Sequence, residues 1–363
     1  MVFGRLGIVG FGGPAAHIAL MREELVRRRG WLDDAAFLDL VGISNLLPGP
    51  TSTEVALHLG HRRAGLRGLL VAGFAFIAPA VILVALAAWA YVTYGTMPEV
   101  GAVLAGIAPV VVAIVAWAAV WLGRTALHSG LTVAIGLAAV IGAMAGVSEF
   151  ALILGLGLLA LVVAEVRDGG RSPAAAGLFA AAGVATAGVA PLAIFLEFVK
   201  IGSLVFGSGY VLVTYLQTEL VDGLGWITEQ QLLDAVAVGQ LTPGPIFSTA
   251  TFVGYLVGGP VGAAAATIGV FLPAFVFVAA SVRMLDRLRT SRRARAFLDG
   301  VNAAAVGVLA TTAARLGDSA IVDPITAAIA LVAAVLLLIG RVGPVALILA
   351  GGAAGLIRVA LTG

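Results

Sequence analysis

Long apolar segments separated by short charged ones follow one another along the whole chain. Residues 69–94 and 100–123 contain no charged side chain, and each segment is longer than the roughly 20 residues that an α-helix needs to cross a bilayer. The pattern predicts six apolar elements in each half, near 3–21, 35–60, 66–95, 100–123, 128–147 and 149–166, and near 198–217, 230–257, 260–283, 296–316, 320–339 and 342–361. One further apolar segment, 174–195, lies between the halves.

The composition identifies lipid as the solvent of these elements. Of 363 residues, 61% are hydrophobic and 11% are charged, whereas soluble domains carry about 25% charge. Because unpaired backbone groups are not tolerated in hydrocarbon, the elements are expected to be helices. The sequence therefore predicts an all-α polytopic membrane protein. The absence of cysteine excludes disulfides and thiolate metal sites, and neither a metal, another cofactor nor a nucleic-acid partner is expected.

The two halves are copies of one unit. Residues 3–50 recur at 198–245 without a gap, at a constant offset of 195 that aligns Gly30-Trp31 with Gly225-Trp226. The same offset aligns a Pro-Gly-Pro in each copy. Tryptophan and proline are rare, so their shared register indicates duplication. We expect an N-terminal repeat at 1–170, a linking transmembrane helix at 171–196 and a C-terminal repeat at 197–363.

The arginines indicate that the second copy is inverted. In the first copy the loops after the first two elements are basic, with Arg22, Arg27, Arg28, Arg29, Arg62, Arg63 and Arg67. In the second copy those loops contain no lysine or arginine, and the basic loop, 283–295, follows the third element. Basic loops stay in the cytoplasm, so the copies have opposite topology. Inverted repeats are typical of secondary transporters, whose substrate site lies between the repeats.

The charge pattern also bears on how the second element of each copy crosses the membrane. The loops on both of its sides are basic in the first copy, and both lack basic residues in the second. This favours re-entrant hairpins for the first two elements of each copy and nine full crossings in total. Thirteen full crossings are the alternative. Both versions place the N-terminus in the cytoplasm and the C-terminus outside.

The Pro-Gly-Pro sequences predict helix breaks inside the membrane, because proline removes a donor and glycine permits turns. A helix that begins there offers free N–H groups and a positive dipole end, which attract an anion. Hydroxyl, amide and basic side chains lie nearby. The residues expected to bind a tetrahedral oxyanion are Arg5, Gly12, Gly13, Pro14, Asn45, Pro48, Gly49, Pro50, Thr51, Ser52, Lys200, Gly207, Ser208, Gly209, Gln240, Pro243, Gly244, Pro245 and Ser248. The alternative is that the breaks are structural kinks and that the two basic residues extend to the interface.

Three carboxylates are candidates for proton coupling, because ionisable residues inside membranes are functional candidates by default. They are Asp39, Glu54 and Asp234; the alternative for the two aspartates is a position facing the headgroups. The histidines His17, His58 and His61 lack metal-ligand spacing, which leaves them as polar lining.

The combined motifs resemble those of the chromate ion transporter family in its long-chain, two-domain form. They are the FGGP near the start, Asn45-Leu46-Leu47-Pro48-Gly49-Pro50, Phe206-Gly207-Ser208-Gly209-Tyr210 and Gln240-Leu241-Thr242-Pro243-Gly244-Pro245. One departure is Asn45, where a glutamine is expected. The resemblance implies export of chromate through the cytoplasmic membrane of a bacterium or archaeon and resistance to chromate, with sulfate as a chemical look-alike. It leaves open whether the protein is a homodimer.

A dianion that leaves a cell moves down the membrane potential, so the predicted export needs no nucleotide. At about 100 mV two charges contribute roughly 4.6 kcal/mol, and the chain contains no GxxxxGK motif. The alternatives are a carrier for sulfate or another anion, coupled to protons, and a membrane enzyme or lipid-phosphate flippase. The sequence shows neither HExxH nor a Ser–His pair of a hydrolase.

Overall fold

Helices make up most of the described residues, which are 2–11, 13–167, 189–206, 209–281 and 291–362 of a computed structural model. No strand occurs in these ranges, so the predicted all-α class is confirmed. The first half contains α1 (Val2–Val9), α2 (Gly13–Met21), the π-helical η1 (Arg22–Arg28), α3 (Asp34–Ser44), α4 (Thr51–Tyr94), α5 (Pro98–Ala126), α6 (Gly130–Met144) and α7 (Glu149–Arg167). The second half contains α8 (Pro191–Leu204), α9 (Val211–Tyr215), the π-helical η2 (Leu216–Gly223), α10 (Glu229–Leu241), the 3₁₀-helical η3 (Ile246–Ser248), α11 (Thr249–Ser281), α13 (Arg292–Ala320), α14 (Pro324–Ile339) and α15 (Pro344–Thr362).

Six helical segments of the described ranges are long and apolar enough to cross a membrane, which confirms a polytopic membrane protein. They are Thr51–Tyr94, Pro98–Ala126, Glu149–Val166, Ile246–Ser281, Arg292–Ala320 and Pro344–Leu361. Residues 168–188 lie outside the described ranges, so most of the predicted linking helix does too. Its last residues continue without a break into α8, which extends through the predicted boundary at residue 196.

The longest helices of the two halves fold back on themselves at the same place. Ala64 and Gly65 have φ/ψ of −149°/32° and 57°/−147°, and Gly258 and Gly259 have −140°/22° and 60°/−152°. The positive φ of the second residue in each turn suits glycine. The offset here is 194, so the copies differ by one residue between the Pro-Gly-Pro and this turn. The predicted element boundaries at residues 60 and 257 fall at these turns.

Both arms of each fold-back pack closely. A Cβ atom built on Gly60 would lie 2.9 Å from the carbonyl carbon of Gly68, and one on Gly254 would lie 3.0 Å from that of Gly262. Residues with side chains could not approach this closely. We call residues 51–63, the first arm of α4, the re-entrant arm.

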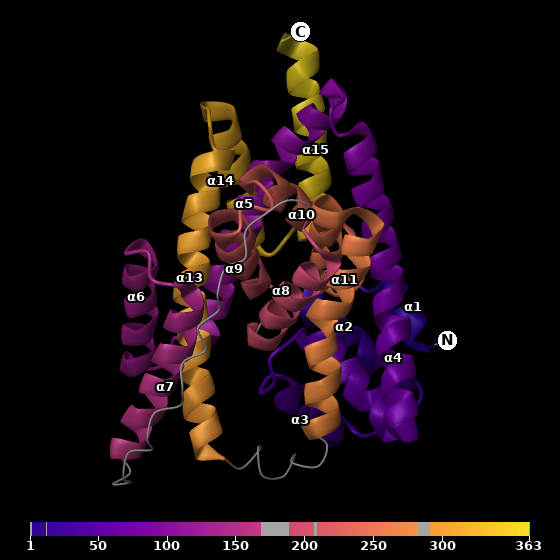
Figure 1. Cartoon of the computed structure of the whole chain (residues 1–363), viewed down its shortest axis with the longest axis vertical. Coiled ribbons are helices and arrows are strands. Elements are labelled where there is room, and N and C mark those ends of the chain that lie inside the picture. Colours follow the sequence, from indigo (N-terminus) through magenta and orange to yellow (C-terminus); the bar gives the residue numbers. More distant parts are fainter. Residues whose placement is uncertain (1, 12, 168–188, 207–208, 282–290, 363) are drawn as a thin grey trace.

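The second element of the first copy enters and leaves by one face. Trp31 precedes α3 and Arg63 ends the re-entrant arm, yet the Arg63 guanidinium lies 5.3 Å from the centre of the Trp31 ring. α3 and the fold-back of α4 lie at the same end of the molecule as the ends of α7, α11 and α13 (Figure 1). This geometry is the one predicted for a re-entrant hairpin and not for a full crossing.

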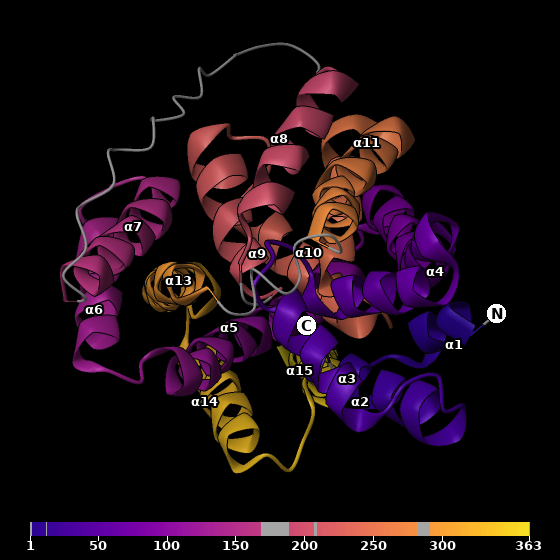
Figure 2. The same cartoon turned by 90° about the horizontal axis from the view of Figure 1, so that it is seen from below.

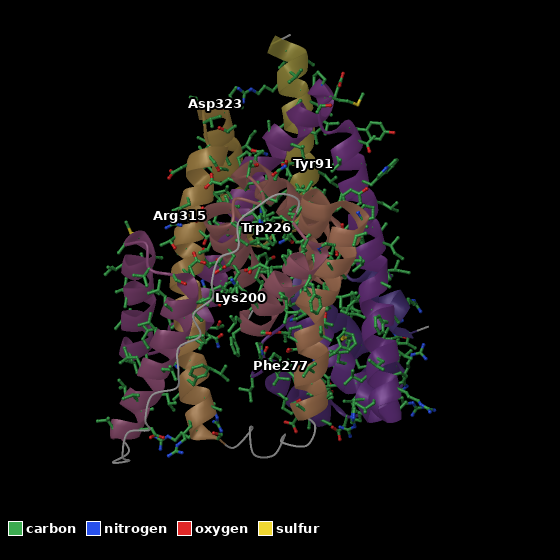
Figure 3. All side chains as sticks on the ribbon, in the orientation of Figure 1. Tyr91, Lys200, Trp226, Phe277, Arg315 and Asp323 are labelled. Atoms are coloured by element: carbon green, nitrogen blue, oxygen red, sulfur yellow. The ribbon has the colours of Figure 1, made fainter. Side chains whose placement is uncertain are left out.

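That end of the molecule is basic, and we call it the basic face. It contains the arginines of η1, of the α4 turn and of the start of α13: Arg22, Arg27, Arg28, Arg29, Arg62, Arg63, Arg67, Arg292, Arg293 and Arg295. Nitrogen-bearing side chains gather there (Figure 3). Acidic neighbours offset part of the charge: the Arg22 guanidinium is 2.7 Å from the Asp34 carboxylate and holds the pKa of Asp34 below its usual range.

The two copies exchange their last helices. α5 of the first copy packs against α14 and α15 of the second, while α13 of the second packs against α6 and α7 of the first, as the view from below shows (Figure 2). Glycines at matched positions permit the contact: a Cβ on Gly106 would lie 2.8 Å from Gly355 Cα, and one on Gly300 would lie 3.0 Å from Gly157 Cα. The repeats are therefore intertwined rather than side by side.

Candidate functional site

Each Pro-Gly-Pro turn is hydrogen-bonded to the opposite copy. The Gly49 amide donates to the Val205 carbonyl oxygen at 2.7 Å, and the Gly244 amide donates to the Gly10 carbonyl oxygen at 2.8 Å. Glycines 49 and 244 are repeat mates, and so are residues 10 and 205. The two bonds are therefore one contact made twice, and they bring the break in each second element to the break in the other copy's first element.

Each turn also packs against the long helix of the opposite copy. A Cβ on Gly244 would lie 2.8 Å from Ala80 Cβ in α4, and one on Gly49 would lie 3.3 Å from Ala274 Cβ in α11. Ala80 and Ala274 each follow a proline, at 79 and 273, and a proline inside a helix leaves a carbonyl without its usual donor. This Pro-Ala pair was not predicted from the sequence, although it recurs at the offset of 194.

The break in the first element of each copy is described in part. Gly13 begins α2 with φ +82°, and a Cβ there would lie 3.9 Å from the Tyr210 hydroxyl oxygen of the second copy. Tyr210 in turn contacts the side chain of Gln240, and Pro14 is the second residue of α2. Gly209 packs against Ile246. The predicted site residues Gly12, Gly207 and Ser208 lie outside the described residues.

Buried polar atoms without a hydrogen-bond partner gather around the two breaks. Within the described residues they include atoms of Ser44, Thr53, Glu54, His58, Gln240 and Thr249. The large majority of buried polar side-chain atoms in proteins are paired, and each unpaired one costs about 1–3 kcal/mol. A concentration of such atoms beside two interrupted helices indicates a place built for a polar solute.

The start of the re-entrant arm is the most polar part of this region. Thr51, Ser52 and Thr53 are buried, and helical bonding begins with the amides of Thr53 and Glu54, which donate to the Pro50 carbonyl at 2.8 and 3.0 Å. The backbone amides of Thr51 and Ser52 come before these two, so the helix itself offers them no carbonyl acceptor. In the second copy Ser248 is buried at the matching place, where Pro245 leads into η3.

Two side chains define the arm's surroundings. The His17 ring joins two segments of the first copy, with Nε2 3.0 Å from the Gly10 carbonyl oxygen and Nδ1 3.2 Å from Ser52 Oγ. The Glu54 side chain is fully buried and turns toward the Pro-Gly-Pro, since a Cβ on Gly49 would lie 2.7 Å from Glu54 Oε1. Both Glu54 oxygens are without a hydrogen-bond partner in the described structure.

The two predicted basic ligands have different surroundings. Arg5 is exposed on α1. Lys200 Nζ is 2.6 Å from Glu197 Oε1, is bonded to Glu219, and lies 5.0 Å from the Phe150 ring centre, near mid-height of the bundle (Figure 3). Its charge is therefore offset by two carboxylates in this structure.

The other coupling candidates and Asn45 also have defined places. Asp234 is buried on α10, where it accepts hydrogen bonds from the Tyr91 hydroxyl at 2.8 Å and from Gln230 Nε2 at 2.9 Å. Tyr91 belongs to the first copy, so this bond also joins the repeats. Asp39 is half-buried on α3, and Asn45 is exposed at a cavity of about 370 Å³ that Phe206 also lines.

Two copies of one helical unit, with interrupted helices that meet between the copies inside a membrane-spanning bundle, are an architecture typical of membrane transporters. The chain belongs to the chromate transporter family: the family pattern matches residues 1–162 and 192–356. This is a family of transport proteins rather than enzymes.

Curated relatives cover nearly the whole chain. A chromate transport protein of Cupriavidus metallidurans is 34% identical over 93% of this chain and 86% of its own length. A probable chromate transport protein of Synechococcus elongatus is 34% identical over 91% of this chain and 87% of its own. A chromate transport protein of Pseudomonas aeruginosa is 33% identical over 87% of this chain and 80% of its own. No solved structure matches the chain.

Proposed function

We propose that this protein exports chromate through the cytoplasmic membrane and thereby gives chromate resistance. The observation that carries the proposal is the reciprocal pair of hydrogen bonds from Gly49 to Val205 and from Gly244 to Gly10, which sets both broken helices at the interface of the copies. The relatives named as chromate transport proteins supply the substrate. Alternating access around this interface is the mechanism.

The anion site lies at the helix starts behind the two turns. The amides of Thr51 and Ser52, with the buried hydroxyls around them, offer donors to a tetrahedral dianion. The Gly49 and Gly244 amides are engaged by carbonyl oxygens of the opposite copy, so they become available only when those bonds open. A carbonyl and an oxyanion compete for the same donors, and this competition links substrate binding to separation of the copies.

The driving force is the membrane potential. With the basic face in the cytoplasm, the N-terminus is inside, the C-terminus is outside, and an exported dianion moves toward the positive side. At about 100 mV the two charges gain roughly 4.6 kcal/mol, which sustains a gradient of about a thousandfold. Glu54, Asp234 and Asp39 are the candidates for coupling to protons, and Glu54 lies nearest the turns.

The test is flux of labelled chromate in vesicles reconstituted with the purified full-length protein, with a potential set by potassium and valinomycin. We expect flux that follows the potential, competition by sulfate, and at least a tenfold loss in Pro50→Ala and Pro245→Ala. Pro324→Ala is the matched control, because Pro324 begins α14 away from the breaks. Absence of potential-driven chromate flux in the wild type would refute the proposal, and full flux in both variants would refute the site.

A further inference from the structure

The re-entrant arm carries a row of carboxylate and imidazole side chains that its repeat mate lacks. Glu54, His58 and His61 are spaced i, i+4 and i+7, so they share one face of the helix. In the matching arm of α11, the residue that corresponds to His58 is Phe252 at the offset of 194 or Val253 at the offset of 195. Both are apolar. The duplicated scaffold therefore does not itself require a histidine here.

The row leads from the basic face to the Pro-Gly-Pro turn. His61 is half-buried next to the exposed Arg62 and Arg63, whereas His58 is 3% exposed and Glu54 is 0% exposed. Side chains on a helix lean toward its N-terminus, so each member of the row points toward the one before it. The last member reaches the turn, as the approach of Glu54 Oε1 to Gly49 shows.

The row has unused hydrogen-bonding capacity. His58 Nε2 and both carboxylate oxygens of Glu54 are buried without a partner in the described structure. Leu57 of the arm packs in an apolar cluster with Leu47, Leu69 and Ala274. The titratable groups on the described elements that pack against α4 are Arg5 of α1, His17 of α2, Asp34 and Asp39 of α3, Glu229 and Asp234 of α10, and Tyr255 of α11.

Several of those neighbouring groups are already engaged in polar contacts, among them His17, Asp34, Glu229 and Asp234. His17 contacts Gly10 and Ser52, and Asp234 is bonded to Tyr91 near the other end of α4. A carboxylate and an imidazole that are buried on one helix face, with atoms that have no hydrogen-bond partner, are the components of a proton path. Imidazole can accept a proton at one ring nitrogen and release one from the other.

We infer that His61 and His58 conduct protons between the basic face and Glu54. A proton enters at the outer nitrogen of His61, a second proton leaves that ring for His58, and the same exchange at His58 delivers a proton to a Glu54 carboxylate oxygen; each ring returns to its neutral form. The inference rests on the proposed function, because Glu54 lies beside the proposed anion site. A charged Glu54 repels a dianion there, so the pH at the basic face controls how tightly chromate binds.

The experiment separates proton movement from anion movement in vesicles that hold the full-length protein in one orientation. Chromate exchange at equal chromate and equal pH needs no net proton flow and reports the proposed function. The pH dependence of chromate KM on the basic-face side, followed after a rapid pH jump, reports the path. We expect the wild-type KM to fall as that pH falls and to respond within the mixing time.

The variants are His61→Ala and His58→Phe, with His128→Ala as the control, since His128 lies outside the row beside Asp299. His61→Ala should keep chromate exchange within about threefold, and both row variants should respond to the jump on the order of 10²-fold more slowly. Added imidazole should restore the response of His61→Ala, which loss of packing alone would not allow. Glu54→Gln should abolish the pH dependence.

An unchanged response in both histidine variants would overturn the path, and so would a pH dependence that survives in Glu54→Gln. His61→Ala, at the half-buried end of the arm, tests the path even if His58→Phe does not fold. Absence of chromate exchange in the wild type would instead refute the proposed function. Normal exchange without any pH dependence would overturn this inference alone.

Discussion

Replacing Gly244 with alanine tests the closest contact between the two copies. Gly244 has φ +104°, a region that costs an L-residue about 1–2 kcal/mol. The new methyl group would also lie 2.8 Å from Ala80 Cβ, and overpacking of this kind costs about 1–3 kcal/mol. The total expected destabilisation is therefore about 2–5 kcal/mol. Because the Gly244 amide bonds to Gly10, the displaced turn should also lose chromate flux.

Gly340→Ala is the control that separates strain from contact. Gly340 has φ +72° with no neighbouring atom within 4 Å of its added Cβ, so only the strain of about 1–2 kcal/mol applies. Gly49→Ala should lie between the two, since the atom that its methyl meets first belongs to a Glu54 side chain, which can move. Thermal unfolding of the purified protein, at about 2 °C per kcal/mol, and vesicle flux measure the series. Equal stability and flux in Gly244→Ala and Gly340→Ala would refute the contact.

Three further predictions concern packing and buried charge, all measured by thermal unfolding. Gly157→Ala should destabilise by about 1–3 kcal/mol because its methyl would meet Val301 Cγ2 at 2.6 Å, whereas Gly155→Ala on the same helix should stabilise by up to about 1 kcal/mol; the opposite order would contradict the exchanged packing. Tyr91→Phe should cost about 1.5–3 kcal/mol by removing a donor from a buried carboxylate, and an effect no larger than that of Tyr94→Phe would argue against the bond. Lys200→Met should cost about 3 kcal/mol by leaving two adjacent carboxylates unpaired, and neutralising one of them should restore part of that loss.

Much of the fold could be predicted because each rule involved is local. Apolar length predicts a membrane helix, and glycine at residues 65 and 259 ends one segment where another begins, so the predicted boundaries coincide with the turns. The basic loops on both sides of the second element predicted re-entry, and in the first copy both ends of that element lie at the basic face, as re-entry requires. The exchange of helices between the copies could not be predicted. Gly106 and Gly300 permit close helix packing, but a glycine does not determine which helix packs against it.

The contacts of the candidate site could also be predicted only in part. The sequence identified the interrupted helices, but it could not show that Gly49 and Gly244 donate to carbonyls of the opposite copy, since a backbone acceptor leaves no mark in the sequence. The surroundings of Lys200 were more accessible. The ion pair itself was not predicted, although its signal is present: the repeat mate of Lys200 is Arg5 and that of Glu219 is Glu24, so opposite charges recur at the same spacing in both copies.

The repeats share a scaffold but differ in chemistry, and this difference gives the transporter two unlike sides. The bonds from Gly49 to Val205 and from Gly244 to Gly10 are geometric equivalents, so symmetry alone gives neither turn a preference to open. The carboxylate of Glu54 lies against only the first turn, and a hydroxyl stands at its mate, Thr249. A change in the charge of Glu54 therefore acts on one bond of the pair. An interface that is symmetric in packing and asymmetric in charge can open first at one turn, which is the step that the proposed alternating access requires.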